Sequence, residues 1–79
     1  ITFKTSATEA KYLRDLPIHS SQEEISADDS HVTFSIFVCP NRNLIMEFCK
    51  HGSRLEVLSP ASVRQAVAEQ LEAAARLYK

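Results

Sequence analysis

Hydrophobic and polar residues alternate most regularly between His31 and Val38. Val32, Phe34 and Ile36 occupy even positions in this stretch, and mostly polar residues occupy the odd positions. Successive side chains of a strand point to opposite faces of the sheet, so this pattern predicts a β-strand with one buried and one open face. We expect this strand to lie at the centre of the fold.

Shorter stretches of the same kind predict three more strands. Residues 1–5 alternate clearly, which makes them the expected partner of the central strand. Residues 23–27 alternate weakly and precede an Asp-Asp-Ser sequence at 28–30, which is typical of an edge strand followed by a tight turn. Residues 55–58 form the last short strand.

Capping residues mark the first helix. Ser6 precedes Glu9 by three residues, which predicts a capping box in which each side chain bonds the other residue's backbone amide. Pro17 disfavours helical geometry at the residue before it, so the helix should end near Leu16. Its expected apolar stripe consists of Ala10, Leu13 and Leu16, with Tyr12 alongside.

Two further helices follow the central strand. Asn41 or Asn43 can cap the second helix, and Gly52 suits the left-handed position after its end. The third helix is predicted to start with Ser59 as its cap and Pro60 at its first position, where a missing amide has no cost. It should run to Tyr78 as an amphipathic helix.

The predicted order of elements is therefore βαββαβα. This order predicts an α+β fold, the ferredoxin-like split βαβ arrangement (βαββαβ), with an added C-terminal helix. Residues 1–79 should form a single small domain, with the first and third strands central. We expect one core between the sheet and two helices, made of Phe3, Leu13, Val32, Phe34, Ile36, Ile45, Phe48 and Val57.

Composition and charge narrow the classes of function. The chain has 9 Lys and Arg against 10 Asp and Glu, a formal net charge of −1, so it lacks the basic surface of a nonspecific nucleic-acid or membrane binder. No apolar run is long enough to span a membrane, and no signal-peptide pattern opens the chain. We expect a cytoplasmic protein with two free, largely buried cysteines. Because the chain opens as ITFK, already in an alternating pattern, we expect it to be a segment of a longer protein.

No residue pattern predicts a metal, cofactor or catalytic site. The three histidines, His19, His31 and His51, have no partner at the spacing of zinc ligands. Cys49 and His51 would point about 200° apart on a helix, and no third orienting group is evident. The acidic residues at 23–24 and 28–29 lack the regular spacing of a cation site and suit a solvated strand edge. We therefore expect no enzyme.

Two segments carry a resemblance to a known family. A first helix runs into a Leu-Pro, His, Ser-Gln segment, and later a helix ending in Gly precedes a Val-Leu-x-Pro strand end and an Arg-containing helix closing in Tyr. The residues that carry it are Leu16, Pro17, His19, Ser21, Gln22, Gly52, Val57, Leu58, Pro60, Arg64 and Tyr78. In this order and spacing the chain resembles the C-terminal (WCX-like) extension of bacterial WYL-domain transcriptional regulators. The chain has no Trp and no Trp-Tyr-Leu motif, so it resembles the extension and not the WYL core.

The resemblance implies a dimerisation and effector-coupling module of a transcriptional regulator. Its partners would be the WYL core domain of the same protein and a second copy in a homodimer, with DNA bound only by a separate N-terminal helix-turn-helix. The expected effector or inter-domain contacts are Arg14, His19, Ser21, Gln22, Arg54 and Arg64, where the arginines could equally be ordinary surface charges. The expected interface on the last helix consists of Val67, Leu71, Ala74 and Tyr78.

Two other functions share the predicted fold. A ferredoxin-like domain can sense a small molecule in a pocket along the sheet or at a dimer seam. An RRM-like module would bind RNA by stacking bases on aromatic residues of the open sheet face. Phe34 and Phe37 are an odd number of residues apart, so at most Phe37 could lie on that face. Thermal shift of the domain with added metabolites would separate the sensor from the other functions.

Overall fold

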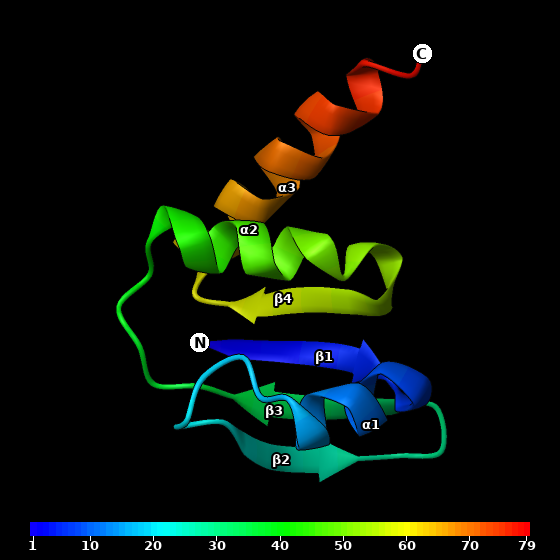
Figure 1. The fold of residues 1–79 in the computed structure, drawn as a ribbon, viewed down its shortest axis with the longest axis vertical. Coiled ribbons are helices and arrows are strands. Elements are labelled where there is room, and N and C mark those ends of the chain that lie inside the picture. Colours follow the sequence, from blue (N-terminus) through cyan, green and yellow to red (C-terminus); the bar gives the residue numbers. More distant parts are fainter.

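The computed structural model describes residues 1–79 and contains four strands and three α-helices (Figure 1). The chain order is β-α-β-β-α-β-α, as predicted, with one short 3₁₀ turn, η1, between α2 and β4. The elements are β1 (Thr2–Ser6), α1 (Ala7–Asp15), β2 (Glu23–Ala27), β3 (His31–Ser35), α2 (Arg42–Lys50), η1 (Gly52–Arg54), β4 (Leu55–Ser59) and α3 (Ala61–Arg76).

The strands form one antiparallel sheet in the order β2-β3-β1-β4. β1 and β3 are central and pair in register from Thr2 opposite Ser35 to Ser6 opposite His31. β2 and β4 form the two edges. This order is that of the ferredoxin-like arrangement and confirms the predicted fold class.

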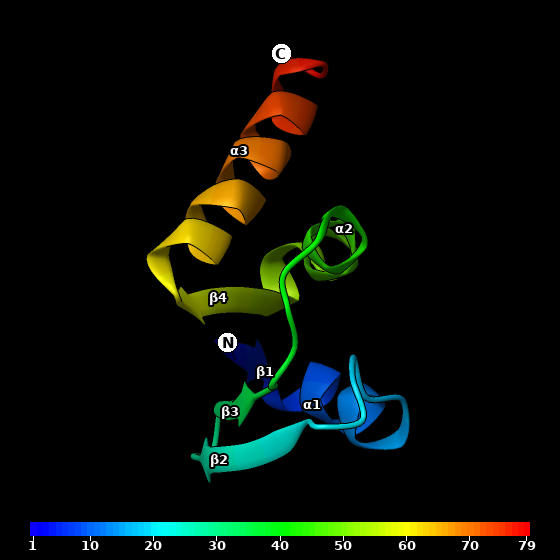
Figure 2. The ribbon, with the colours of Figure 1, turned by 90° about the vertical axis from the view of Figure 1, so that its left-hand side faces the viewer.

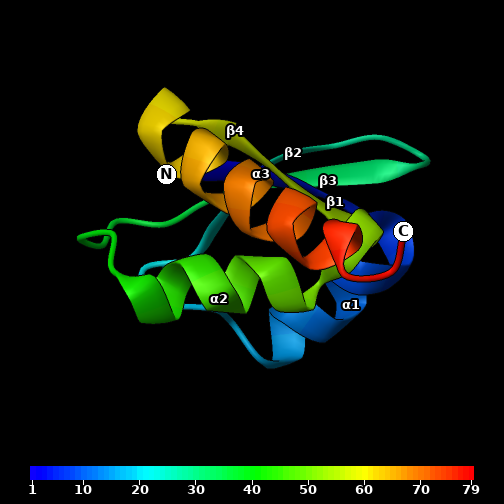
Figure 3. The ribbon, with the colours of Figure 1, turned by 90° about the horizontal axis from the view of Figure 1, so that it is seen from above.

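The helices divide into two groups. α1 and α2 lie side by side on one face of the sheet, which Figure 2 shows nearly edge-on. α3 leaves the sheet at β4, runs beside α2 in the view of Figure 3, and its C-terminal half extends beyond the sheet. One face of the sheet is thus covered, and α3 is only partly attached to the domain.

The core fills the layer between the sheet and the helices. Phe3 of β1 stacks on Phe34 of β3 with ring centroids 5.6 Å apart, and Phe48 of α2 lies 5.4 Å from Phe3. Seven of the eight predicted core residues are buried, and Ile45 is only half-buried against them. Val63 and Val67 extend this core onto α3. Phe34 is therefore on the inner face, as the alternation in its strand predicted.

Most predicted helix ends are confirmed. The Ser6 hydroxyl accepts a hydrogen bond from the Glu9 amide at 3.1 Å, and the Asn41 side chain accepts one from the Leu44 amide at 2.8 Å. Gly52 has a φ of +59°, the left-handed conformation expected after the end of α2. The start of α3 differs from the prediction, because its cap is Pro60, and the Ser59 hydroxyl bonds Thr2 Oγ1 at 2.6 Å instead.

The central strand is shorter than predicted. β3 ends at Ser35, opposite Thr2, where β1 begins. Beyond it, the Phe37 amide donates to the Ser21 hydroxyl at 2.7 Å, so a side chain from the α1–β2 loop replaces a neighbouring strand. Phe37 is 90% exposed. Cys39 lies in the following loop and is exposed, which corrects the prediction of two buried thiols.

The apolar stripe of α1 is narrower than predicted. Ala10 and Leu13 are buried on the face of α1 that contacts the sheet. Tyr12 lies on another side of the helix and Leu16 follows its end, so both are exposed. No helix of the fold is both long enough and apolar enough to cross a membrane.

Candidate functional site

A groove of about 600 Å³ runs between α1 and the C-terminal end of α2. Its apolar wall is formed by side chains of α1, and its polar wall by side chains of α2 and η1. The lining residues are Thr8, Glu9, Tyr12, Leu13, Leu16, Glu47, Lys50, His51 and Arg54. Two of them, Glu9 and His51, are buried polar residues, which makes this groove the candidate site.

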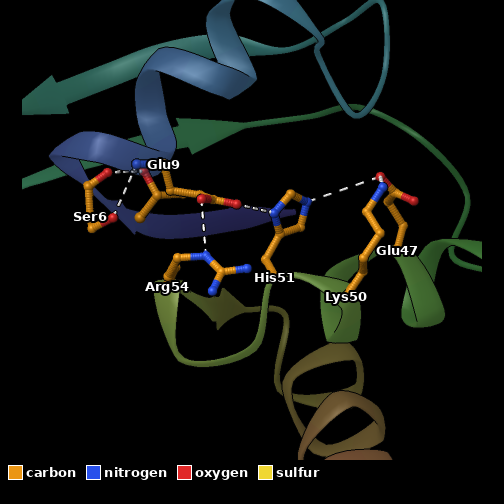
Figure 4. Close-up of polar contacts among 7 residues, drawn as sticks. Ser6, Glu9, Glu47, Lys50, His51 and Arg54 are labelled. Atoms are coloured by element: carbon orange, nitrogen blue, oxygen red, sulfur yellow. Dashed lines mark hydrogen bonds and ion pairs between the residues drawn. The ribbon is translucent and has the colours of Figure 1, made fainter.

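Glu9 joins three elements at the inner end of the groove (Figure 4). One carboxylate oxygen, Oε2, lies 2.5 Å from His51 Nδ1, and the other, Oε1, accepts from Arg54 Nε at 3.1 Å. The first turn of α1 is thereby tied to the residues between α2 and β4. Both His51 and Arg54 are held by the same buried carboxylate.

The surroundings of Glu9 favour its ionised form. The hydrogen bond from His51 is the main cause that lowers the pKa of Glu9 below its ordinary value of 4.5, and the charge of Arg54 acts in the same direction. Burial opposes this shift by disfavouring the charged form. Glu9 is therefore a carboxylate at neutral pH and accepts both bonds.

The second ring nitrogen of His51 has no partner. Nε2 is buried and makes no hydrogen bond, and the carboxylate oxygen Oε1 of Glu47 lies 4.0 Å away. Glu47 in turn pairs with Lys50 at 2.9 Å. Figure 4 shows this ion pair facing Nε2 from α2. A buried nitrogen without a partner is uncommon and marks the polar end of the groove.

Sequence patterns predicted only part of this arrangement. In the predicted capping box, the Glu9 side chain accepts a hydrogen bond from the Ser6 amide. In the structure its carboxylate bonds His51 and Arg54 instead. Ser6 still caps the Glu9 amide, so half of the box is present. The partners of Glu9 lie 42 and 45 residues further along the chain, and no local spacing could have indicated them.

Cys49 does not form a nucleophile–base pair with His51. Burial raises the pKa of the Cys49 thiol, which keeps the thiol protonated at neutral pH, whereas reactive cysteines are thiolates. Its Sγ faces the Val67 carbonyl of α3 at 3.9 Å. The Nδ1 of His51 is occupied by Glu9. Cys49 is therefore a packing residue between α2 and α3.

The three candidate arginines lie in different places and each pairs with a glutamate. Arg14 bonds Glu24 at 2.9 Å, across from α1 to β2. Arg64 bonds Glu56 at 2.7 Å and the Val57 carbonyl at 2.8 Å, along the free edge of β4. Only Arg54 borders the groove. The structure thus does not assemble the three into one site, although each keeps unpaired N–H groups and remains partly exposed.

The other candidate contact residues hold the loop between α1 and β2. The Gln22 side chain accepts from the Ile18 amide at 2.9 Å and donates to the Leu13 carbonyl at 2.8 Å. His19 Nδ1 lies 2.7 Å from the Ser21 hydroxyl, which also bonds the Phe37 backbone. Their polar groups are used within the domain, so His19, Ser21 and Gln22 shape the loop.

The expected interface residues divide between the core and the surface. Val67 is buried in the domain's own core and is not available to a partner. Leu71, Ala74 and Tyr78 are exposed, as are all residues from position 71 onward. The three exposed residues continue the helical face that begins with Val67.

The open face of the sheet has no Phe, Tyr or Trp side chain. The only such residues in the four strands are Phe3 and Phe34, and both are buried on the other face. Base stacking on an RRM-like sheet requires exposed aromatic residues on these strands. The geometry therefore does not favour the RNA-binding alternative.

Comparison with known proteins gives one match. The family model of the WCX domain matches residues 1–75, which include the whole sheet, α1, α2 and nearly all of α3. No curated protein matches the chain significantly. The matched range confirms the family indicated by the sequence resemblance. The chain therefore belongs to the WCX domain family, the C-terminal domains of WYL-type regulators.

Proposed function

We propose that this domain is a non-catalytic dimerisation and effector-coupling module of a WYL-type transcriptional regulator. The observation that carries the proposal is the apolar face of α3, which is buried at its first half and uncovered at its second. Val63 and Val67 anchor the helix to the core, whereas Leu71 and Tyr78 on the same side are 38% and 89% exposed. Within a single copy of the domain, no other element covers this part of the face.

A second copy of the chain is the proposed partner of this face. A self-complementary patch across a two-fold axis is buried twice, and such two-fold dimers are the commonest soluble oligomers. Ala74 lies about one turn beyond Leu71 on α3 and lets another backbone approach closely, while Tyr78 follows the end of the helix, which stops at Arg76, two residues short of the predicted end. A small hollow between β4 and α3 widens the apolar area beside the helix; its lining consists of the charged residues Glu56 and Arg64 and the apolar residues Leu55, Val57, Val67, Ala68 and Leu71.

The edges of the sheet are poorer dimer seams. β2 carries the exposed charges Glu23 and Glu24, which disfavour the addition of another strand, and its pairing is irregular between Glu24 and Ser26. At β4, the guanidinium of Arg64 already bonds the Val57 carbonyl. Charged residues and irregular pairing on edge strands discourage hydrogen bonding to the strand of another chain.

We expect the domain to associate reversibly at high micromolar concentration in sedimentation experiments. Leu71→Glu places a charge in the apolar face and should keep the domain monomeric. Gln70→Glu adds the same charge to a neighbouring exposed position of α3 and should leave association unchanged. A wild-type domain that remains monomeric at high concentration would contradict dimerisation by this domain on its own. If Gln70→Glu weakened association as much as Leu71→Glu, the added negative charge and not the loss of the apolar face would explain the effect, which would also contradict the proposed interface.

The coupling part of the proposal concerns the WYL core domain of the same protein. Arg14, Arg54 and Arg64 expose donor groups that can pair with anionic groups of that domain or of its effector, because a guanidinium binds two oxygens at once. DNA would be bound by a separate N-terminal helix-turn-helix, since the net charge of −1 leaves this domain few contacts to phosphates.

In the full-length regulator, we expect Arg14→Ala, Arg54→Ala and Arg64→Ala each to weaken the response to effector. DNA affinity without effector should remain unchanged, because none of the three is proposed to touch DNA. Reporter transcription with and without effector, together with DNA affinity, measures the two effects separately. Arg76→Ala, a control on the exposed end of α3 that breaks only a pair with Glu72, should leave both unchanged. An unchanged response in all three variants would contradict this role.

A further inference from the structure

The unpartnered nitrogen of His51 has a defined hydrogen-bonding role. The Glu9 carboxylate can only accept, so the proton of a neutral His51 ring resides on Nδ1, which faces Glu9. Nε2 then carries a lone pair and acts as an acceptor. A carboxylate behind one ring nitrogen that orients the other is the arrangement by which proteins present a histidine to a ligand. His51 is 8% exposed, so the orientation is fixed by packing as well.

A second acceptor lies beside Nε2. Glu47 Oε1 is 4.0 Å from Nε2, too far for a bond between the two groups and close enough for one donor group to reach both. A nitrogen with two N–H groups at hydrogen-bond distance spans acceptors roughly 4 to 5 Å apart. In the structure, Lys50 Nζ forms an ion pair with Glu47 Oε1 at 2.9 Å. Lys50 and Glu47 are long side chains at the surface and can give way at little cost.

The wall opposite these acceptors is apolar. Tyr12, Leu13 and Leu16 of α1 line the groove, and Tyr12 and Leu16 are largely exposed there. An aromatic ring or alkyl chain on this wall would be removed from water, and the face of Tyr12 also attracts cations. The groove thus combines two adjacent acceptors with an apolar surface.

We propose that the groove between α1 and α2 binds a cationic amidinium, guanidinium or ammonium group attached to an apolar body. The N–H donors bridge His51 Nε2 and Glu47, and displace the Lys50 ammonium from Glu47. The apolar body lies against Tyr12 and Leu16. This site is separate from the α3 face, and Leu71→Glu is expected to leave binding unchanged, so failure of one proposal does not decide the other.

The charges that face the site are consistent with a cation while His51 is neutral. Arg54 of η1 is paired with Glu9 of α1 through Nε, and Lys50 of α2 is exposed at the surface. An anion has no donor for Nε2 and would lie next to Glu47, so the two acceptors reject it. The unpaired N–H groups of Arg54 remain available to an anionic group elsewhere.

Benzamidine is the first probe, titrated into the intact 79-residue domain and followed by NMR of the backbone amides and of the His51 ring nitrogens. We expect saturable shifts at His51, Glu47 and Tyr12 at low millimolar concentration. Benzoate has the same ring with the opposite charge and should leave the His51 ring nitrogens unshifted. N-acetyl-argininamide, which carries the same cation as a protein side chain, tests the second source: tighter binding than benzamidine identifies a partner's arginine, and weaker binding a free aromatic cation.

Two surface variants test the acceptor Glu47 and its competing cation Lys50 without risk to the fold. Glu47→Gln should weaken benzamidine binding about tenfold, the effect of losing one charge-assisted bond. Lys50→Gln removes the competing cation and should strengthen binding about two- to fivefold. Three results would overturn the proposal: shifts of the His51 ring nitrogens with benzoate at neutral pH, unchanged binding of benzamidine by Glu47→Gln, or no binding of either cation.

Discussion

Replacing Phe34 with alanine is expected to lower the free energy of unfolding by about 3 to 5 kcal/mol. Phe34 is 2% exposed and stacks on Phe3 at the centre of the sheet, where two helices cover it. The substitution removes an aromatic ring from a close-packed site, and the surrounding residues cannot move enough to fill the cavity that is left. Domains of this size are stable by only about 5 to 15 kcal/mol, so much of that stability would be lost.

Phe37→Ala is the matched control for this prediction. Phe37 is three residues further along the same segment, but its side chain lies on the surface, so its replacement should change stability by less than about 0.5 kcal/mol. Urea unfolding of both variants, followed by circular dichroism, measures the difference. Equal losses in the two variants would contradict the assignment of the buried face.

Glu9→Gln is expected to lower the free energy of unfolding at neutral pH by about 1.5 to 3 kcal/mol, the range for hydrogen bonds to charged groups. The amide keeps the size of the side chain but cannot accept from His51 and Arg54 as a carboxylate does. The variant should also loosen the connection between α1 and the residues that follow α2. Glu69→Gln, an exposed position on α3, should have little effect on stability.

The effect of Glu9→Gln should depend on pH in one direction. The pKa of Glu9 is lowered in the folded state, so its stabilisation is complete above the unfolded value of about 4.5 and is lost as the pH falls through the folded value. Unfolding measured at pH 6 and at pH 3 should therefore show a large difference from wild type at pH 6 and a smaller one at pH 3. A difference that stays constant between the two would show that the carboxylate charge contributes nothing.

Local sequence patterns predicted most of the fold. The alternation in residues 31–38 identified the buried face of β3, and the weak alternation in residues 23–27 matched β2. The caps at Ser6 and Asn41 and the glycine after α2 were also correct. Each of these features depends on neighbours within a few residues, and such short-range physics is visible in a single sequence.

The errors arose where distant residues compete with local ones. β3 was predicted to continue to Val38, but its partner strand β1 begins at Thr2. Beyond that point the Phe37 amide donates its hydrogen bond to the Ser21 hydroxyl and not to a strand. Ser59 was expected to cap α3, but Thr2 binds its hydroxyl from the neighbouring strand. These contacts join positions far apart in the chain, and they depend on the register of the sheet.

The candidate site was less predictable than the fold. Glu9 was interpreted as half of a capping box and His51 as an ordinary histidine, because each residue is unremarkable in its own segment. Only the packing of α1 beside α2 brings them together. The arginines were predicted as contact residues, and the structure shows that each first serves an ion pair within the domain. A side chain's partners decide its role, and the sequence does not contain them explicitly.

Crosslinking between two copies of α3 tests most directly whether this domain is a dimerisation module. In a domain with Cys39→Ser and Cys49→Ala, Ala74→Cys places one thiol on the proposed face and Lys11→Cys places one on the exposed side of α1. With a short reagent that links two thiols, we predict a covalent dimer from Ala74→Cys that disappears when Leu71→Glu is added, and none from Lys11→Cys. Ala74→Cys that stays monomeric, or links no better than Lys11→Cys, would contradict dimerisation through α3.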